Sequence, residues 1–288
     1  MSIVYLNGDY LEKDDAKVSV LDRGFIFGDG VYEVIPCYGS HLFRLDQHLQ
    51  RLSDSLSGIR LINPLSHSQW VDVLEEIVRR NNDNNADQSI YLQVTRGVAK
   101  RDHAFPDKVS PTIFIMSNPM DPVSNDKLEK GISAISHEDI RWRYCHIKSI
   151  ALLPNTMMRQ VAREAGADEA ILDRDGKITE GAASNVFIVK DDTIITPPKD
   201  DCLLPGITRD LILEIAASAD LNYTEADISI KELQTADEIW LTSSTKEILP
   251  VTQLDGVAVG NGKPGPHWKD MLARYQQYKK RLRSGDAH

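Results

Sequence analysis

The sequence is poor in cysteine and lacks both a surplus of positive charge and a long apolar run. Its three cysteines, Cys37, Cys145 and Cys202, are too few and too scattered among 288 residues for a disulfide framework or a zinc site. We therefore expect no metal. No apolar stretch approaches the length of a membrane span, so we expect no association with a membrane.

The charge balance points away from nucleic acid. Lysine and arginine number 33 against 43 aspartates and glutamates, a formal net charge of -10. A phosphate backbone is therefore an unsuitable main partner, whereas a small anionic ligand needs only local cations. The first residues contain no basic segment followed by an apolar core, so we expect no signal peptide and a cytoplasmic enzyme.

The chain is long enough for two ordinary domains. The segment 117–126 contains Pro119, Pro122 and several turn-forming residues. We predict a small N-terminal α/β domain at 1–118, a linker at 119–126 and a larger C-terminal domain at 127–288. Asn7-Gly8 predicts a hairpin turn, and Thr208 is a plausible N-cap for a helix over 208–219. The predicted fold class is α/β (α+β), with mostly antiparallel sheets and flanking helices.

A single lysine stands in a mostly apolar stretch. Lys148 lies between Ile147 and Ile150, and Pro154-Asn155 follows a few residues later. We predict that Lys148 lies near the end of a strand and that a helix begins after it. This pattern alone fits a surface cation, or an amine in a poorly solvated pocket. Burial lowers the pKa of a lysine and frees a nucleophilic amine.

Four motifs occur together in a fixed order. They are YLNG at 5–8, DRGFIFGDGVYE at 22–33, TEGAASNVF at 179–187 and LTSSTKE at 241–247. Together with Lys148 they resemble the signature of the class IV (fold type IV) pyridoxal-phosphate aminotransferases. The resemblance covers almost the whole chain. It implies a two-domain fold, pyridoxal 5′-phosphate as cofactor, and a homodimer.

The resemblance also implies roles for the residues that bind the cofactor. Lys148 matches the Schiff-base lysine, which needs a lowered pKa to act as a proton shuttle. Glu180 matches the acid that pairs with the pyridine nitrogen. One departure is Ala182-Ala183, because many members have serines there. The cofactor-binding residues that the resemblance adds to these two are Arg51, Leu204, Ile207, Thr208, Ser243 and Ser244. Ile207 and Thr208 open a helix, and helix N-termini bind anions.

The segment 96–106 is informative about the substrate. It contains Arg101 and His103, which resemble the carboxylate trap of D-amino acid aminotransferases, with Tyr32 as third member. Alternation along an extended segment puts both side chains on one face, where two donors can share one carboxylate. The resemblance implies that they act from the neighbouring subunit.

The leading hypothesis is a transaminase that exchanges amino groups between D-amino acids, such as D-alanine, and 2-oxo acids, such as 2-oxoglutarate. It would work by a ping-pong cycle through pyridoxamine phosphate. Alternatives are a branched-chain or (R)-amine transaminase, an aminodeoxychorismate-type lyase on the same scaffold, and a cofactor-binding protein without catalysis. The paired Arg101 and His103 speak against the lyase and the other transaminases.

Overall fold

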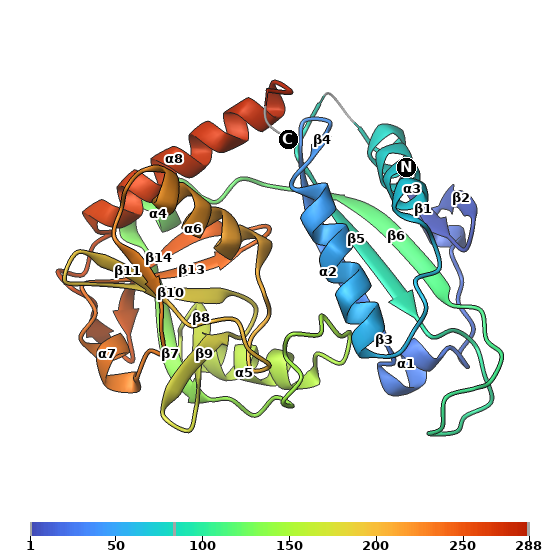
Figure 1. Ribbon diagram of the computed structural model, residues 1–288, viewed down its shortest axis with the longest axis horizontal. Coiled ribbons are helices and arrows are strands. Elements are labelled where there is room, and N and C mark those ends of the chain that lie inside the picture. The colour runs from blue at the N-terminus through green and yellow to red at the C-terminus, as the bar shows by residue number, and fades with distance from the viewer. Residues whose placement is uncertain (1, 83–84, 287–288) are drawn as a thin grey trace. The chain divides into compact units, whose positions relative to one another are not determined.

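A computed structural model describes residues 2–82 and 85–286 of the chain. The chain divides into two compact units. The first runs up to Asp121 and also includes Ile147–Ala151 and the residues from Arg281 on; the second comprises Pro122–His146 and Leu152–Lys280. The predicted division at 119–126 had assigned Lys148 to the C-terminal domain, whereas its contacts group it with the first unit. Figure 1 shows the elements of each unit.

The first unit is built on an entirely antiparallel sheet with the strand order β2-β1-β6-β5-β3-β4. Its strands are β1 (Ile3–Leu6), β2 (Asp9–Glu12), β3 (Gly30–Tyr38), β4 (His41–Leu42), β5 (Gln88–Thr95) and β6 (Thr112–Pro119). The predicted turn between β1 and β2 is confirmed, because Asn7 and Gly8 have φ angles of 52° and 110°. Such positive φ angles favour glycine and asparagine.

Helices α2 (Leu45–Gly58) and α3 (His67–Arg80) pack against this sheet and share one hydrophobic core with it. Ser66 caps α3 through a capping box with Gln69. Shorter elements are the 3-10 turn η1 (Lys13–Asp15) and α1 (Arg23–Phe27). Figure 1 shows α2 lying along β3, and these two elements carry Glu33, His48 and Arg51.

The second unit contains a mixed sheet with the path β12-β11-β10-β13-β14-β7-β8-β9 and β15 paired to β14. Three pairings, β11 with β12, β7 with β14 and β7 with β8, are parallel, and the others are antiparallel. The strands are β7 (Ile132–Glu138), β8 (Glu169–Arg174), β9 (Lys177–Gly181), β10 (Asn185–Lys190), β11 (Thr193–Thr196), β12 (Tyr223–Glu225), β13 (Glu238–Ser243), β14 (Glu247–Leu254) and β15 (Val257–Ala258).

The remaining helices are α4 (Asn125–Lys130), α5 (Leu153–Glu164), α6 (Ile207–Ser218), α7 (Ile230–Gln234) and α8 (Pro266–Arg283). The predicted cap of α6 was wrong. Gly206 is the N-cap, it offers no side chain, and Thr208 lies inside the first turn. A glycine is required here because a Cβ at Gly206 would lie 1.9 Å from Oδ1 of Asn185.

The segment around Lys148 is not the end of a regular strand, which corrects the prediction. It pairs with the edge of β3 through an isolated antiparallel bridge between Val31 and Ser149. The Tyr32 N–H donates to the Lys148 carbonyl at 2.9 Å, and the Ile150 N–H donates to the Gly30 carbonyl at 3.1 Å. These two bonds explain why the segment belongs to the first unit.

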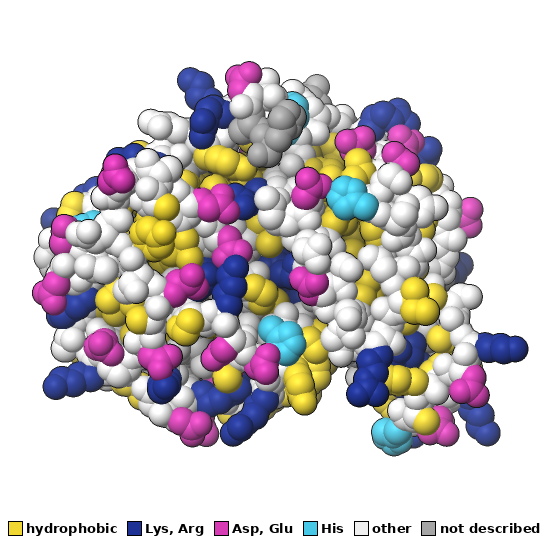
Figure 2. Space-filling model, viewed as in Figure 1, with side chains coloured by type: hydrophobic (Ala, Val, Ile, Leu, Met, Phe, Trp, Pro, Cys, Tyr) yellow, Lys and Arg dark blue, Asp and Glu magenta, His cyan; other side chains and the backbone are white. Residues whose placement is uncertain are grey.

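On the face shown in Figure 2, basic and acidic side chains are interspersed. Among the described residues, no helix is both long enough and apolar enough to cross a membrane.

Candidate active site

Lys148 is held by its backbone and lies close to an aromatic ring. Its N–H donates to Oγ of Ser55 on α2 at 3.1 Å, and its carbonyl accepts from Tyr32. The preceding Ile147 is buried in the core and packs against Gly58, where a Cβ would approach it within 2.8 Å. Nζ of Lys148, whose side chain is half-buried, lies 4.2 Å from the centre of the Tyr32 ring. The amine is therefore fixed over an aromatic face.

A buried group of charged residues connects α2 to β3. Side chains alternate along a strand, so Glu33 lies on the same face of β3 as Val31 and Ile35, which belong to the core. Glu33 accepts hydrogen bonds from Arg51, Nε to Oε1 at 2.8 Å and Nη2 to Oε2 at 2.7 Å. Nδ1 of His48 lies 2.8 Å from Oε2. Arg51 is therefore half of a buried bidentate ion pair with Glu33.

The electrostatics of this group follow from burial and charge. Burial alone would raise the pKa of Glu33, but Arg51, by its charge and its hydrogen bonds, and His48 hold that pKa far below its ordinary value. Burial lowers the pKa of His48 against the opposing effect of Glu33. His48 is therefore neutral at pH 7, and its Nδ1–H donates to the Glu33 carboxylate.

Arg101 and His103 lie in the connection between β5 and β6, which extends away from the sheet (Figure 1). Both side chains are exposed, and both lie against Phe27 of α1. The Arg101 guanidinium carbon is 5.4 Å from the centre of the Phe27 ring, and the His103 and Phe27 ring centres are also 5.4 Å apart. The structure thus brings Arg101 and His103 to one aromatic ring. Tyr32 has other neighbours, stacking on Tyr91 with ring centres 5.7 Å apart.

Two buried arginines anchor this connection. Nη1 of Arg23 donates to the carbonyls of Asp102 at 2.6 Å and Ala104 at 3.3 Å. The guanidinium of Arg96 lies 3.7 Å from the centre of the Phe105 ring. Both arginines also bond the same oxygen of Asp29, at 2.7 and 2.8 Å. Because the backbone on both sides of His103 is fixed, an exposed loop can present its side chains in a defined geometry.

In the second unit, Glu180 lies near the end of β9 with its carboxylate almost fully buried. Oε1 accepts a hydrogen bond from Nη1 of Arg141. Oε2 accepts from the backbone N–H of Leu204 at 3.1 Å and from Nδ2 of Asn185 at 3.3 Å. Leu204 is half-buried, and its carbonyl accepts a second bond from Asn185 at 2.8 Å. The structure therefore brings the candidates Glu180 and Leu204 together.

The departure at Ala182-Ala183 has a local explanation. Ala182 is buried with Met158 and Ala162 of α5, and its backbone bonds Ala170 and Asn155. A serine at 182 would place a hydroxyl in this apolar cluster. Ala183, in contrast, is exposed.

Unsatisfied polar groups gather around the first turn of α6. The hydroxyls of Thr208 and Thr242 are buried and have no hydrogen-bond partner among the described residues. Thr242 is paired with Asn185 across β13 and β10, and Asn185 contacts Gly206 at the cap of α6. The half-buried Ser243, whose hydroxyl accepts from the Lys246 N–H at 3.3 Å, and the half-buried Ser244 follow directly.

These features suit a phosphate. Buried hydroxyls without a partner are uncommon and costly, and an uncapped helix N-terminus offers free N–H groups and a positive dipole end. Within the second unit, the hydroxyls of Thr208 and Thr242 and the N–H groups at the start of α6 therefore fit the phosphate of pyridoxal phosphate, and the fixed carboxylate of Glu180 fits its pyridine nitrogen.

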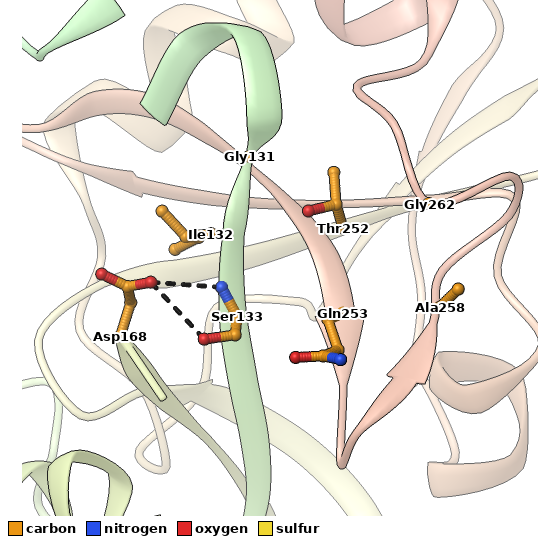
Figure 3. Close-up of a pocket in the computed structure, with 8 residues that line it drawn as sticks. All are labelled: Gly131, Ile132, Ser133, Asp168, Thr252, Gln253, Ala258 and Gly262. Carbon is orange, nitrogen blue, oxygen red and sulfur yellow. Dashed lines mark hydrogen bonds between the residues drawn. The ribbon is translucent and has the colours of Figure 1, made fainter. Parts of the chain in front are cut away.

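A separate pocket in the second unit contains none of the candidates. It has a volume of about 430 Å³ and is open to solvent. Figure 3 shows its lining residues, Gly131, Ile132, Ser133, Asp168, Thr252, Gln253, Ala258 and Gly262. The Asp168 carboxylate already accepts bonds from the backbone and hydroxyl of Ser133, at 3.2 and 3.5 Å, and from Lys127 at 3.0 Å. The charged side chain that lines the pocket therefore already has partners within the protein.

Sequence reasoning overlooked several residues. Glu33 and His48 could have been found, because Glu33 interrupts the apolar alternation of β3 and His48 lies one turn before Arg51 on the apolar side of α2. Arg141 and Thr242 could not have been found from the sequence. The residues next to Arg141 do not show which distant carboxylate its side chain contacts. The residues next to Thr242 do not show that its hydroxyl lacks a hydrogen-bond partner among the described residues.

Comparison with known proteins identifies the family. The sequence model described as Amino-transferase class IV matches residues 30–254. A D-alanine aminotransferase of Bacillus licheniformis is 41% identical over 273 residues, 95% of both chains. Another from Staphylococcus haemolyticus is 40% identical over 279 residues, 96% of this chain and 98% of the relative.

Solved structures agree with this assignment. The branched-chain amino acid aminotransferase of Escherichia coli superposes with a TM-score of 0.91 at 31% identity, covering 99% of this chain and 96% of that one. A second branched-chain amino acid aminotransferase, solved with pyridoxamine 5′-phosphate, has the same fold, with a TM-score of 0.91 at 24% identity over 99% and 96% of the two chains. The protein therefore belongs to the class IV aminotransferases, a family of pyridoxal-phosphate enzymes with fold type IV.

Proposed function

We propose that this protein is a D-amino acid transaminase that exchanges amino groups between D-amino acids, such as D-alanine, and 2-oxo acids, such as 2-oxoglutarate. The observation that carries the substrate class is the pair Arg101 and His103, gathered on Phe27 in a chain 41% identical to a D-alanine aminotransferase. An arginine and a histidine side by side offer two donors to one carboxylate. Every amino acid and 2-oxo acid of this reaction carries such a group.

The proposed cofactor is pyridoxal 5′-phosphate, which supplies a ring that accepts the electrons left when Cα loses its proton. Lys148 would hold its aldehyde carbon. Glu180 would accept a hydrogen bond from its pyridine nitrogen. Its phosphate would be bound by Arg51, Ser243, Ser244 and the first turn of α6, which contains Ile207 and Thr208. The buried hydroxyl of Thr208, which has no hydrogen-bond partner within the described part of the chain, supports this last assignment.

The chain's own residues would then perform the remaining tasks. Lys148 would take the proton from the substrate Cα and return it, and the bond of its N–H to Ser55 holds its backbone in place for this role. Leu204 would pack against the ring, and its N–H, bonded to Glu180, keeps it in position. Arg101, His103 and Tyr32 would orient the substrate carboxylate and so determine which side of Cα faces Lys148.

A homodimer is part of the proposal. Exposed apolar side chains lie around α1 and the β5–β6 connection, with Phe25 75% and Phe105 51% exposed; the others are Val18, Val20, Leu21 and Val98. Such a group is typical of a surface that another protein covers. A second copy there would receive Arg101 and His103 at its own site, by a two-fold interface. A cytoplasmic location completes the proposal.

Transamination of branched-chain L-amino acids is the second candidate, favoured by the likeness to the Escherichia coli enzyme at 31% identity. A panel of paired D- and L-amino acids with 2-oxoglutarate separates the two, by measuring the 2-oxo acid formed. Product from D-alanine and none from L-leucine is expected. Turnover of L-leucine but not of D-alanine would overturn the proposal. Release of pyruvate without transfer of an amino group would indicate a lyase. Conversion of (R)-amines alone would indicate an amine transaminase.

A further inference from the structure

The side chain of Arg141 contacts the carboxylate of Glu180, although the two residues are far apart in sequence. Only 6% of the Arg141 side chain and 7% of the Glu180 side chain are exposed. Nη1 of Arg141 donates a hydrogen bond to Oε1 of Glu180, while Oε2 accepts from Leu204 and Asn185. Donors from three segments therefore fix both carboxylate oxygens, and the donor to Oε1 is a guanidinium.

Asp139 holds Arg141 in place. Nε of Arg141 donates to Oδ1 of Asp139 at 2.9 Å and Nη2 to Oδ2 at 2.8 Å. Nη2 also donates to the Cys202 carbonyl at 3.1 Å. The guanidinium thus has one edge on Asp139 and its remaining nitrogen on Glu180, a geometry that a rigid planar fork provides and a lysine does not.

The charges around Glu180 balance within this cluster. A second arginine, Arg174, lies 3.1 Å from Oδ2 of Asp139. Burial would raise the pKa of Asp139, but Arg141 and Arg174 lower it, so Asp139 stays ionised and compensates one of the two arginines. The buried thiol of Cys145 also faces Arg141 and has a pKa raised by burial, to about 11, so it stays uncharged at pH 7.

We propose that Arg141 is a positioning residue that fixes the Glu180 carboxylate and keeps it negatively charged, so that Glu180 can serve the pyridine nitrogen as a hydrogen-bond acceptor. A buried carboxylate without a cationic neighbour tends to take up a proton and would then present an O–H donor. A guanidinium keeps its own proton at every accessible pH. This inference rests on the proposed function for the role of Glu180, but the contact of Arg141 with Glu180 does not.

The test uses two matched double variants. Asp139→Asn/Arg141→Gln removes one negative and one positive charge together, including the partner of Glu180. Asp139→Asn/Arg174→Gln makes the same change in charge but leaves Arg141 on Glu180. Comparing them separates the specific contact from the general loss of buried charge.

The first readout needs no cofactor. Carbon-13 NMR of side-chain carboxyls in the apo-protein follows the titration of Glu180, assigned by its loss in Glu180→Gln. In Asp139→Asn/Arg141→Gln the midpoint should rise by about 1–3 pH units, as expected on removing a neighbouring arginine. In the Arg174 control it should move much less. An unchanged midpoint in folded Asp139→Asn/Arg141→Gln would overturn the proposal.

The second readout is the nitrogen-15 signal of pyridoxal phosphate labelled in its ring and bound to the protein. The Arg141 double variant should shift this signal towards that of unprotonated pyridine at pH 8, and the Arg174 control should not. If Glu180→Gln leaves the nitrogen signal unchanged, the proposed role of Glu180 fails while the apo-protein titration still decides on Arg141.

A further variant covers a failure to fold. Arg141→Lys keeps the charge but has one nitrogen to share between Asp139 and Glu180. We expect a smaller rise of the Glu180 midpoint, and a midpoint identical to that of the natural protein would overturn the role assigned to the guanidinium.

Discussion

Arg51 places its guanidinium on both carboxylate oxygens of Glu33, at 2.8 and 2.7 Å, with 6% and 1% of the two side chains exposed. The pair links α2 to the core face of β3. A cation that is already fixed before a ligand arrives loses little conformational freedom on binding. Glu33 therefore stabilises the first unit and also fixes the position of the Arg51 guanidinium.

The first prediction concerns stability. Glu33→Gln keeps the size of the side chain but leaves Arg51 without its buried counter-charge, a change that costs about 3–5 kcal/mol in comparable buried pairs. The midpoint of urea unfolding should fall accordingly. Glu76→Gln is the control, because Glu76 pairs with Arg79 and Arg80 on the surface of α3. Equal midpoints for the two variants would contradict the assigned importance of the pair.

The second prediction concerns pH. The folded state lowers the pKa of Glu33 far below its ordinary value of 4.5. Ionised Glu33 therefore stabilises the fold above that value, and the contribution is lost as the pH falls below it and the unfolded chain takes up the proton. The unfolding free energy of the natural protein should decline between pH 5 and lower values more steeply than that of Glu33→Gln. Parallel pH profiles would show that Glu33 is not responsible.

The third prediction is that Arg51 helps to retain the cofactor phosphate. Loss of one charged hydrogen-bond partner costs about 1.5–3 kcal/mol. Arg51→Ala should therefore release pyridoxal phosphate more readily during dialysis against phosphate buffer, as followed by the absorbance of the bound cofactor. Arg79→Ala, on the exposed face of α3, should retain it. If both variants retained the same amount of pyridoxal phosphate, Arg51 would have only a structural role in its pair with Glu33.

The elements of both units could largely be predicted because their patterns are local. The hairpin at Asn7-Gly8 and the helix capped by Ser66 depend on neighbouring residues only. The N-cap of α6 could not be predicted, since the choice of Gly206 follows from the approach of Asn185 on another strand.

For the candidate site, the sequence indicated individual residues but not their partners. The family resemblance pointed to Glu180 and Arg51, whereas their partners Arg141 and Glu33 emerge only once distant segments lie together. Likewise, nothing in the sequence around Lys148 shows that its segment pairs with β3, because this depends on two long-range backbone bonds. Partners of this kind require the tertiary structure.

The fourth prediction tests which lysine carries the cofactor. Borohydride reduction followed by peptide mapping should place the pyridoxyl group on Lys148. Lys246 is the sharpest competitor, because burial lowers its pKa and it lies just after Ser243 and Ser244. Lys246→Arg should leave the label in place, and Lys148→Arg should abolish it. Label found on Lys246 would refute the assignment of Lys148.

The fifth prediction concerns the substrate carboxylate. Arg101→Ala should raise the KM for D-alanine strongly, because the substrate loses a charged hydrogen bond. Such a bond contributes about 1.5–3 kcal/mol to the binding free energy. It should affect an amine without a carboxylate much less. Lys100→Ala, the neighbouring exposed cation, is the control and should leave the KM for D-alanine close to that of the natural protein. Equal effects on the amine and the amino acid would remove Arg101 from carboxylate binding.

The last prediction is that Arg101 acts in the site of the neighbouring subunit. Complementation between two inactive variants tests it. If the trap crosses a two-fold interface, each site combines Lys148 of one subunit with Arg101 of the other. An Arg101→Ala subunit mixed with a Lys148→Ala subunit then yields one intact site and one site with both defects, so about half of the activity per dimer should return. Tagged subunits purified in sequence ensure that only mixed dimers are assayed. If verified mixed dimers stay inactive, Arg101 acts on the substrate of its own subunit or on none, and the anchoring of its loop by Arg23 and Arg96 serves the fold of the first unit alone.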